Sequence, residues 1–275
     1  MSDRSEHLRP KAPWFAGVVF TLVVVVLHLP LLFLFASSFF ERIGETWVFT
    51  LRWFQEVLAD QALAAAFLNS LIVAVTSSTL ATVIGTGAAV ALHRGGFRWG
   101  PFLRALSLTS LVLPEIVFAL ALLSWFFLLK VTLGLHSVIA AHVTFILSYV
   151  ILIVSARLST MDSSVEDAAR DLGAGEWKLL WRVTLPSIWP SVGAAFMLGF
   201  LLSFDDFLIT FFVNGAGQDT LPVKLYTSMK IGLTPKLNAL ATLMCAVSAL
   251  LLIFAFRSSS FRDVLKAGEE PGDQR

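Results

Sequence analysis

The sequence has few charged residues and only one cysteine. Asp, Glu, Lys and Arg make up 14% of its 275 residues and hydrophobic residues 57%, whereas an ordinary soluble domain has about 25% charged residues. The single cysteine, Cys245, excludes a disulfide within the chain and a cysteine metal cluster, and we expect it to be a small filler of the core. The sequence also has no G-x-x-x-x-G-K-[ST] loop, so any ATP that drives this protein is bound by another chain.

The sequence contains several long apolar runs. Four of them contain no Asp, Glu, Lys or Arg at all, and each reaches the ~20 residues that a bilayer crossing needs: 12–40, 61–93, 131–156 and 237–256. Two further apolar segments are interrupted only by carboxylates. We therefore predict an all-α integral membrane protein with a single transmembrane domain over 14–257, the first span being an uncleaved anchor. Its six helices are expected at about 14–40, 63–93, 103–129, 136–157, 188–213 and 237–257.

The distribution of positive charge predicts the orientation. Of the 20 Lys and Arg residues, 14 lie on the side of the two chain ends and 6 on the opposite side. Cytoplasmic loops carry the excess of Lys and Arg in membrane proteins. The N-terminal segment 1–13, the loop 159–186 and the tail 258–275 are therefore expected in the cytoplasm.

The cytoplasmic loop contains the pattern of a docking helix. Ser163 followed by Glu166 predicts a capping box at its start, and Gly173 and Gly175 end it. An apolar stripe recurs at i, i+3, i+4 and i+7, formed by Val165, Ala168, Ala169 and Leu172. The polar residues are expected to be available to a partner: Glu166, Asp167, Arg170 and Asp171. A solvated helix in a loop would explain the cap and the stripe equally well.

The spacing of further residues favours the docking helix. Asp167, Ala168 and Ala169 are followed, after three intervening residues, by Gly173 and, after nine further intervening residues, by Val183, Thr184, Leu185 and Pro186. This pattern resembles the EAA loop of ABC importer permeases, with Asp in place of the usual Glu and Val183 in place of Ile. The resemblance implies a coupling helix held in a groove of a separate ATPase, which binds the ATP and Mg, so no cofactor is expected in this chain. The implied coupling residues are Glu166, Asp167, Ala168, Ala169, Arg170, Gly173, Leu185 and Pro186.

Three carboxylates are the only charged side chains that lie inside the predicted spans and away from their ends. They are Glu115, Asp205 and Asp206. A carboxylate at the centre of a membrane helix costs roughly 2.5–3.5 kcal/mol, so such groups normally face a cavity or a partner. A cationic substrate would supply that partner; buried acids that only hydrogen-bond within the protein are the alternative. Because neighbours on a helix point about 100° apart, we expect only one of the two aspartates to line a cavity, and we expect Pro114 to kink its helix.

Other residues of the spans carry weaker signals. Phe204 and Trp125 are candidates for cation–π contact with an alkylammonium group along the substrate pathway. His142 is expected to be packed or hydrogen-bonded rather than catalytic. Gly85 and Gly87 are expected to be close-packing positions between helices.

A second resemblance concerns the substrate. The stretches 203–212, 220–226 and 232–242 resemble the second permease subunit of spermidine/putrescine importers. That family implies a polyamine as cargo and a bacterial inner membrane location within the lipid bilayer. It also implies three partners, an ABC ATPase dimer, a second homologous permease and a periplasmic solute-binding protein, and no nucleic acid.

Several alternatives remain open at this point. Related permeases serve opines, iron or other amines, and three lysines of the outer loop, Lys224, Lys230 and Lys236, do not suit a cationic cargo. The sequence does not decide between a heterodimer and a homodimer. A membrane-embedded lipid enzyme would need a nucleophile or a metal set, and no Ser/His/Asp arrangement is discernible. A channel or proton-coupled carrier would have no use for the 163–186 segment.

Overall fold

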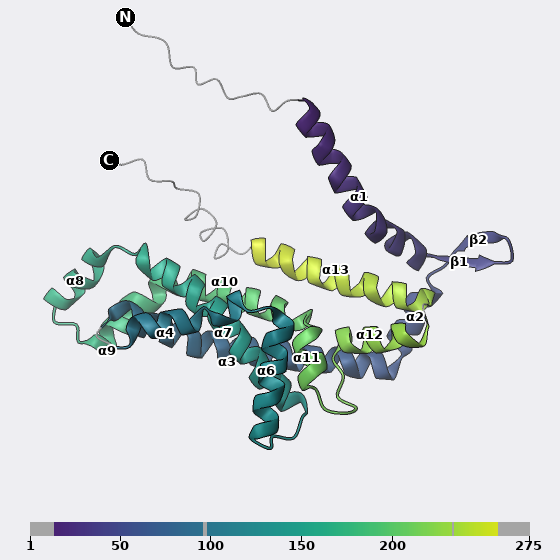
Figure 1. The fold of residues 1–275 in the computed structure, drawn as a ribbon. Helices are drawn as coiled ribbons and strands as arrows, with labels where there is room; N and C mark the ends of the chain where they lie inside the picture. The colour runs from purple at the N-terminus through teal and green to yellow at the C-terminus, as the bar shows by residue number, and fades with distance from the viewer. Residues whose placement is uncertain (1–13, 96–97, 233, 258–275) are drawn as a thin grey trace, which may run out of the picture.

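A computed structural model describes residues 14–95, 98–232 and 234–257, and the predicted cytoplasmic segments 1–13 and 258–275 lie outside the described residues. Three long helices form the centre of the molecule (Figure 1). These are α3 (Gln61–Arg94), α7 (Leu135–Ser159) and α10 (Leu185–Phe204), which pack against one another more extensively than any other elements. Their shared core is aliphatic, and it is built around Ala81, Ala89, Ile146, Val150, Val154, Leu158, Ile188 and Ala195.

Glycines allow these helices to approach closely. A Cβ added to Gly85 would lie 2.7 Å from Cγ1 of Val150, and one added to Gly199 would lie 2.6 Å from Cγ2 of Ile146. Both distances are shorter than real carbon contacts, so only glycine fits there. The close-packing role predicted for Gly85 is confirmed. The same prediction is wrong for Gly87, which has no described atom within 4 Å of such a Cβ.

Five helical segments of the described residues are long and apolar enough to cross a membrane: α1 (Trp14–Ser38), α3, α7, the continuous run Glu176–Phe204 and α13 (Pro235–Arg257). A sixth crossing results if one bent pair is counted as a single span. In this pair, Gly100–Val112, containing α4 (Gly100–Ser107) and α5 (Thr109–Val112), meets α6 (Glu115–Leu128) at 112°.

This bend is a break rather than the expected kink, and Pro114 explains it. Leu113 has extended backbone angles, φ −71° and ψ 138°, because a proline ring clashes with a preceding residue in the helical conformation. Glu115 then becomes the first residue of α6.

The span predicted over 188–213 is also divided. It begins earlier, because α9 (Glu176–Leu179) continues through a π-helical turn, η1 (Leu180–Thr184), into α10. It then stops at Phe204, and α11 (Leu208–Val213) starts after a short break. Asp206 lies in the break and accepts hydrogen bonds from the backbone N–H groups of Ile209 and Thr210 at 3.4 and 2.8 Å. Such a bond offers the backbone an alternative to the continuous helical ladder.

The segments opposite α8 (Ser163–Asp171) form their own small structures. Strands β1 (Phe40–Ile43) and β2 (Thr46–Phe49) pair in antiparallel fashion, a departure from the all-α prediction. Helices α2 (Arg52–Ala59) and α12 (Leu221–Ile231) pack near them, joined by an apolar cluster that includes Val57, Leu221 and Leu240. In Figure 1, α8 and α9 lie at one end of the bundle, and α2, α12 and the hairpin lie at the other.

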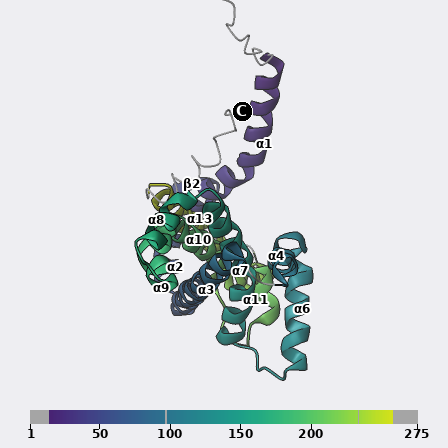
Figure 2. The ribbon, with the colours of Figure 1, turned by 90° about the vertical axis from the view of Figure 1, so that its left-hand side faces the viewer.

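Helix α1 projects away from the other helices in both views (Figure 1; Figure 2). Ser38 is its only buried residue, and the amide Nδ2 of Asn238 in α13 donates to Oγ of Ser37 at 3.0 Å. The apolar side chains of α1 therefore face surroundings outside the chain. Cys245 of α13 is exposed as well, so its predicted place in the core is wrong.

Candidate functional site

Helix α8 begins one residue earlier than the capping prediction places it. Its N-cap is Asp162, whose carboxylate accepts the backbone N–H of Ser164 at 2.9 Å. This hydrogen bond holds the pKa of Asp162 below its ordinary value. The predicted capping box of Ser163 and Glu166 is therefore wrong, because an aspartate upstream takes the capping role.

The end of α8 lies at the predicted glycine. Gly173 has a positive φ of 80°, and its N–H donates to the carbonyl of Arg170 at 2.8 Å, while the N–H of Ala174 donates to that of Ala169 at 3.0 Å. This pair of bonds is a Schellman motif, which needs a left-handed residue and so favours glycine. Gly175 has an ordinary φ of −70° and is the N-cap of α9.

Glu166 and Arg170 attach α8 to the rest of the chain. The hydroxyl of Thr184 in η1 donates to Glu166 at 2.6 Å, and Arg170 forms ion pairs with Glu166, Asp167 and Glu176 at 3.6, 3.3 and 3.5 Å. Glu176 also accepts Nη1 of Arg94, at the end of α3, at 2.9 Å. We expected these polar residues to be available to a partner, but most of their charge is paired inside the chain.

Three of the four residues of the apolar stripe of α8 are exposed in the described part of the chain. Leu172 is 89% exposed and Val165 is 52% exposed; Ala168 is exposed and Ala169 half-buried. Two large side chains next to the stripe were not predicted: Trp177 and Trp181 are exposed and have ring centroids 5.8 Å apart. Their i, i+4 spacing was the available signal.

The last two residues predicted for coupling lie at the start of α10. Leu185 packs against the central aliphatic core. Pro186 stands in the first turn of α10, a position where proline is well tolerated. The loop is therefore fastened to the helix that leads to the aspartates.

The three membrane carboxylates line one open cavity of about 560 Å³, which we call the acidic pocket. Glu115 comes from the start of α6, and Asp205 and Asp206 come from the break between α10 and α11. The expectation that only one aspartate would line a cavity is wrong, because the two do not belong to a continuous helix. The other lining residues are Phe145, Tyr149, Leu201, Leu202, Phe207 and Leu208.

Asp206 is the buried member, with 8% of its surface exposed. Its Oδ2 lies 3.1 Å from Nε2 of His142 and accepts the hydroxyl of Thr210 at 2.8 Å. Nδ1 of His142 is hydrogen-bonded to Oγ of Ser203 at 2.6 Å, and Ser203 to Ser77 at 3.0 Å. The hydrogen-bonded role predicted for His142 is confirmed. Asp206 is thus held by a network from α3, α7 and α10 (Ser77, His142 and Ser203).

Glu115 and Asp205 are exposed members of the pocket. Asp205 accepts one hydrogen bond, from the hydroxyl of Ser248 in α13 at 2.9 Å. The two aromatic candidates lie elsewhere: Phe204 is 2% exposed and packs with Ala74 and Phe200, and Trp125 is 55% exposed and does not line the pocket.

Two of the three puzzling lysines have partners within the chain. The ammonium of Lys230 lies 4.7 Å from the ring centroid of Tyr226, in reach of a cation–π contact. That of Lys236 lies 2.6 Å from Oδ2 of Asp60, just ahead of α3. Their charges are thus partly offset within the chain, although the ring of Tyr226 also lies 4.5 Å from that of Phe207, which lines the acidic pocket.

Relatives of the chain are permease proteins. The spermidine/putrescine transport system permease protein PotC of Escherichia coli K12 is 38% identical over 239 residues, which cover 86% of this chain and 90% of the relative. The putrescine transport system permease protein PotI of the same organism is 37% identical over 243 residues, covering 85% and 86%.

Solved structures and a family model agree with these relatives. A bacterial ABC transporter that imports alginate has a TM-score of 0.72 at 13% identity, covering 90% of this chain and 95% of that one. The MetNI methionine ABC transporter has a TM-score of 0.63 at 18% identity, covering 74% and 95%. These likenesses confirm the predicted type I ABC importer permease fold. The family model described as "Binding-protein-dependent transport system inner membrane component" matches residues 81–262. The chain therefore belongs to the family of inner membrane components of binding-protein-dependent transport systems.

Proposed function

We propose that this permease translocates a polyamine, spermidine or putrescine, inward through the membrane, using ATP that a partner subunit hydrolyses. The observation that carries the proposal is the convergence of Glu115, Asp205 and Asp206 on one pocket. Carboxylates within membrane spans normally face a cavity or a partner, and a polyamine brings several ammonium groups on one flexible chain. The names of the two relatives, which are permeases of polyamine systems, support the same cargo.

The pocket suits an alkylammonium chain in its remaining surface. Phe145, Tyr149 and Phe207 line it together with leucines, so methylene groups can pack on apolar surface while ring faces attract the cation. Glu115 and Asp205 are the exposed acids, and they are the groups that bind ammonium directly. Asp206, the buried acid, adds negative charge to the pocket. Phe204 and Trp125 have no part in this contact in our proposal, because neither lines the pocket.

In this proposal, α8 receives the movement that ATP hydrolysis drives in the partner ATPase. The largely exposed stripe with Ala168, Ala169 and Leu172 docks in a groove of the ATPase, and Gly173 sets the end of the docking helix. Glu166 and Arg170 transmit the motion, because their bonds to Thr184 and Glu176 connect α8 to η1 and α9, which continue into α10. Asp167 orients Arg170 through its ion pair, and Leu185 and Pro186 anchor the return of the loop to α10. That helix ends at the aspartates.

In this proposal, the complete transporter contains three kinds of component besides this chain. Two ATPase subunits bind the ATP and Mg, a second homologous permease completes the pore, and a periplasmic solute-binding protein delivers the cargo. The chain lies in the bacterial inner membrane with both termini and α8 in the cytoplasm. The excess of Lys and Arg on that side supports this orientation.

Uptake of labelled spermidine and putrescine by the reconstituted transporter tests the cargo. We expect Asp205→Asn and Glu115→Gln each to lower uptake at least about tenfold, the effect of losing about 1.4 kcal/mol of binding. Glu45→Gln in the β1–β2 turn removes a negative charge far from the pocket and is expected to leave uptake unchanged. Normal polyamine uptake by both pocket variants would refute the proposal. Competition by an opine or a ferric chelate, with none by polyamines, would assign another cargo.

A further inference from the structure

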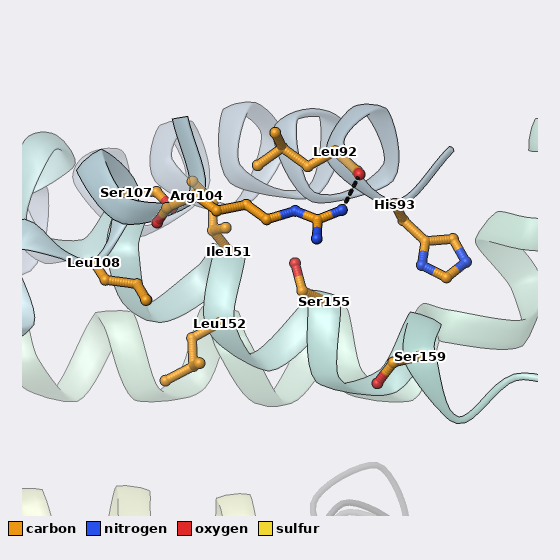
Figure 3. Close-up of a pocket in the computed structure, with 9 residues that line it drawn as sticks. All are labelled: Leu92, His93, Arg104, Ser107, Leu108, Ile151, Leu152, Ser155 and Ser159. Atoms are coloured by element: carbon orange, nitrogen blue, oxygen red, sulfur yellow. Dashed lines mark hydrogen bonds between the residues drawn. The ribbon is translucent and has the colours of Figure 1, made fainter. Parts of the chain in front are cut away.

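A second cavity lies at the end of the bundle nearest α8, between the last turn of α3, the helix α4 and the C-terminal half of α7 (Figure 3). It has a volume of about 270 Å³ and does not share any residue with the acidic pocket. We call it the Arg104 pocket. Its lining consists of Leu92, His93, Arg104, Ser107, Leu108, Ile151, Leu152, Ser155 and Ser159.

One end of the Arg104 pocket is polar and basic. The guanidinium of Arg104 extends between the helices, and its Nη2 donates to the backbone carbonyl of Leu92 at 2.7 Å, with Ser155 below it and His93 beyond (Figure 3). A guanidinium has five N–H donors, and no other hydrogen bond joins this one to the described part of the chain. The lining has no Asp or Glu. This end is therefore suited to an anion.

The other end is apolar and continues deeper into the bundle. Leu108 and Leu152 form it, and three residues of the lining also line an adjoining cavity of about 500 Å³, namely Leu92, Ser107 and Ile151. That cavity is walled mostly by apolar groups, among them Leu106, Phe118 and Leu147. From Ser159 to Leu147, α7 rises by about 18 Å at 1.5 Å per residue. The two cavities lie next to each other along α7, with a cation in the first and mostly apolar walls in the second, and we refer to them together as the slot.

We propose that this slot binds an anionic phospholipid, with the phosphate on Arg104 and one acyl chain along α7. The planar guanidinium matches phosphate oxygens in bidentate geometry, and basic pockets between membrane helices on the cytoplasmic side hold anionic headgroups. In the sequence, Arg104 belongs to the basic segment 94–104, on the side that carries most of the positive charge. The bound lipid holds α4 against α3 and α7. It thereby stabilises the segment of α4 and α5, which leads through the bend at Pro114 to Glu115.

Lipid retention by the purified complete transporter tests the proposal. Native mass spectrometry would compare phosphatidylglycerol with phosphatidylcholine of the same acyl chains, and we expect the wild type to retain one phosphatidylglycerol preferentially. Arg104→Gln should weaken that retention about fivefold, the effect of one cation near an anionic surface, whereas Arg104→Lys, which keeps the charge but not the planar fork, should weaken it by a smaller factor. Arg98→Gln is the matched control, because it removes an exposed charge from the same turn without touching the slot.

A second variant separates the acyl chain from the headgroup. Leu152→Trp fills the apolar end and leaves the guanidinium in place, so it should also reduce retention of phosphatidylglycerol. Equal retention of the two lipids by the wild type would overturn the proposal, as would undiminished retention in Arg104→Gln or full displacement by inorganic phosphate. If Arg104→Gln prevents assembly, the wild-type comparison and Leu152→Trp decide the question.

Discussion

At the scale of single residues, the three carboxylates of the acidic pocket divide into two kinds. Asp206 is buried and held by His142 and Thr210, whereas Glu115 and Asp205 are exposed. The sequence predicted that the three acids are special, because charge is rare in the spans. It did not predict this division, because His142 lies 64 positions from Asp206 and nothing in the local pattern connects them.

We predict that His142 positions Asp206 rather than contacting cargo. His142→Ala removes a hydrogen bond to a buried carboxylate, and leaving a buried polar group without its partner typically costs about 1–3 kcal/mol. The free energy of unfolding of the assembled transporter in mixed micelles should fall accordingly, and His142→Gln, which keeps a donor and an acceptor, should restore part of it.

A double-mutant cycle distinguishes positioning from general packing. His142→Ala combined with Asp206→Asn should cost less than the sum of the single changes, by about 0.5–3 kcal/mol. The polyamine concentration for half-maximal uptake should also rise in His142→Ala, because Asp206 then loses its fixed orientation. Strictly additive stabilities would show that His142 does not hold Asp206.

At the scale of elements, α8 shows which local signals were sufficient. Its position, its stripe and its terminal glycine were predicted from the sequence, because helix ends and periodicity are properties of neighbouring residues. The start was wrong by one residue, since Asp162 and Ser163 are both good caps and only the backbone geometry chooses between them. The hairpin β1–β2 was missed, because four-residue strands give too short a pattern.

We predict that the conformation of Gly173 is required for coupling. An L-residue at its φ of 80° costs about 1–2 kcal/mol, equivalent to a factor of about 5–30 in an equilibrium. Gly173→Ser should therefore lower substrate-stimulated ATP hydrolysis in that range. Gly173→Asn should retain more activity, because asparagine tolerates the left-handed region.

Gly175→Ser is the matched control for this loop. Gly175 has an ordinary φ and an N-cap position, where serine is favoured, so the coupled ATPase rate should stay close to that of the wild type. If the serine variants of Gly173 and Gly175 behave alike, backbone conformation at Gly173 is not what coupling requires.

At the scale of the whole molecule, long-range contacts join helices that the hydropathy of the sequence identifies only as separate spans. Asp60 caps α3 through the N–H groups of Ala62 and Leu63 and pairs with Lys236 of α13. The hydrogen bond from the Lys236 ammonium, followed by those from the backbone, holds the pKa of Asp60 below its ordinary value of 3.8. The start of the second span and the start of the last are thereby joined.

We predict an acid-dependent contribution from this pair. A carboxylate whose folded pKa is depressed stabilises the fold fully above its ordinary pKa, and the contribution disappears as pH falls through the lowered value. Lys236→Gln should reduce the unfolding free energy at pH 7 by no more than about 1 kcal/mol, because both side chains are partly exposed. Melting curves from pH 7 down to 3 should show the difference from the wild type shrinking below pH 4; a constant difference would contradict the assignment.

The sequence by itself determined the class of this protein, its long apolar helices, the short helix in the 159–186 loop and the three acids within the spans, because composition, periodicity and short spacing carry that information locally. Only the tertiary structure decided that Glu115 meets Asp205 and Asp206. That meeting depends on two breaks, at Pro114 and at Asp206, and on how closely α3, α7 and α10 pack. The Arg104 pocket has the same origin, since its residues come from three helices whose proximity no local pattern specifies.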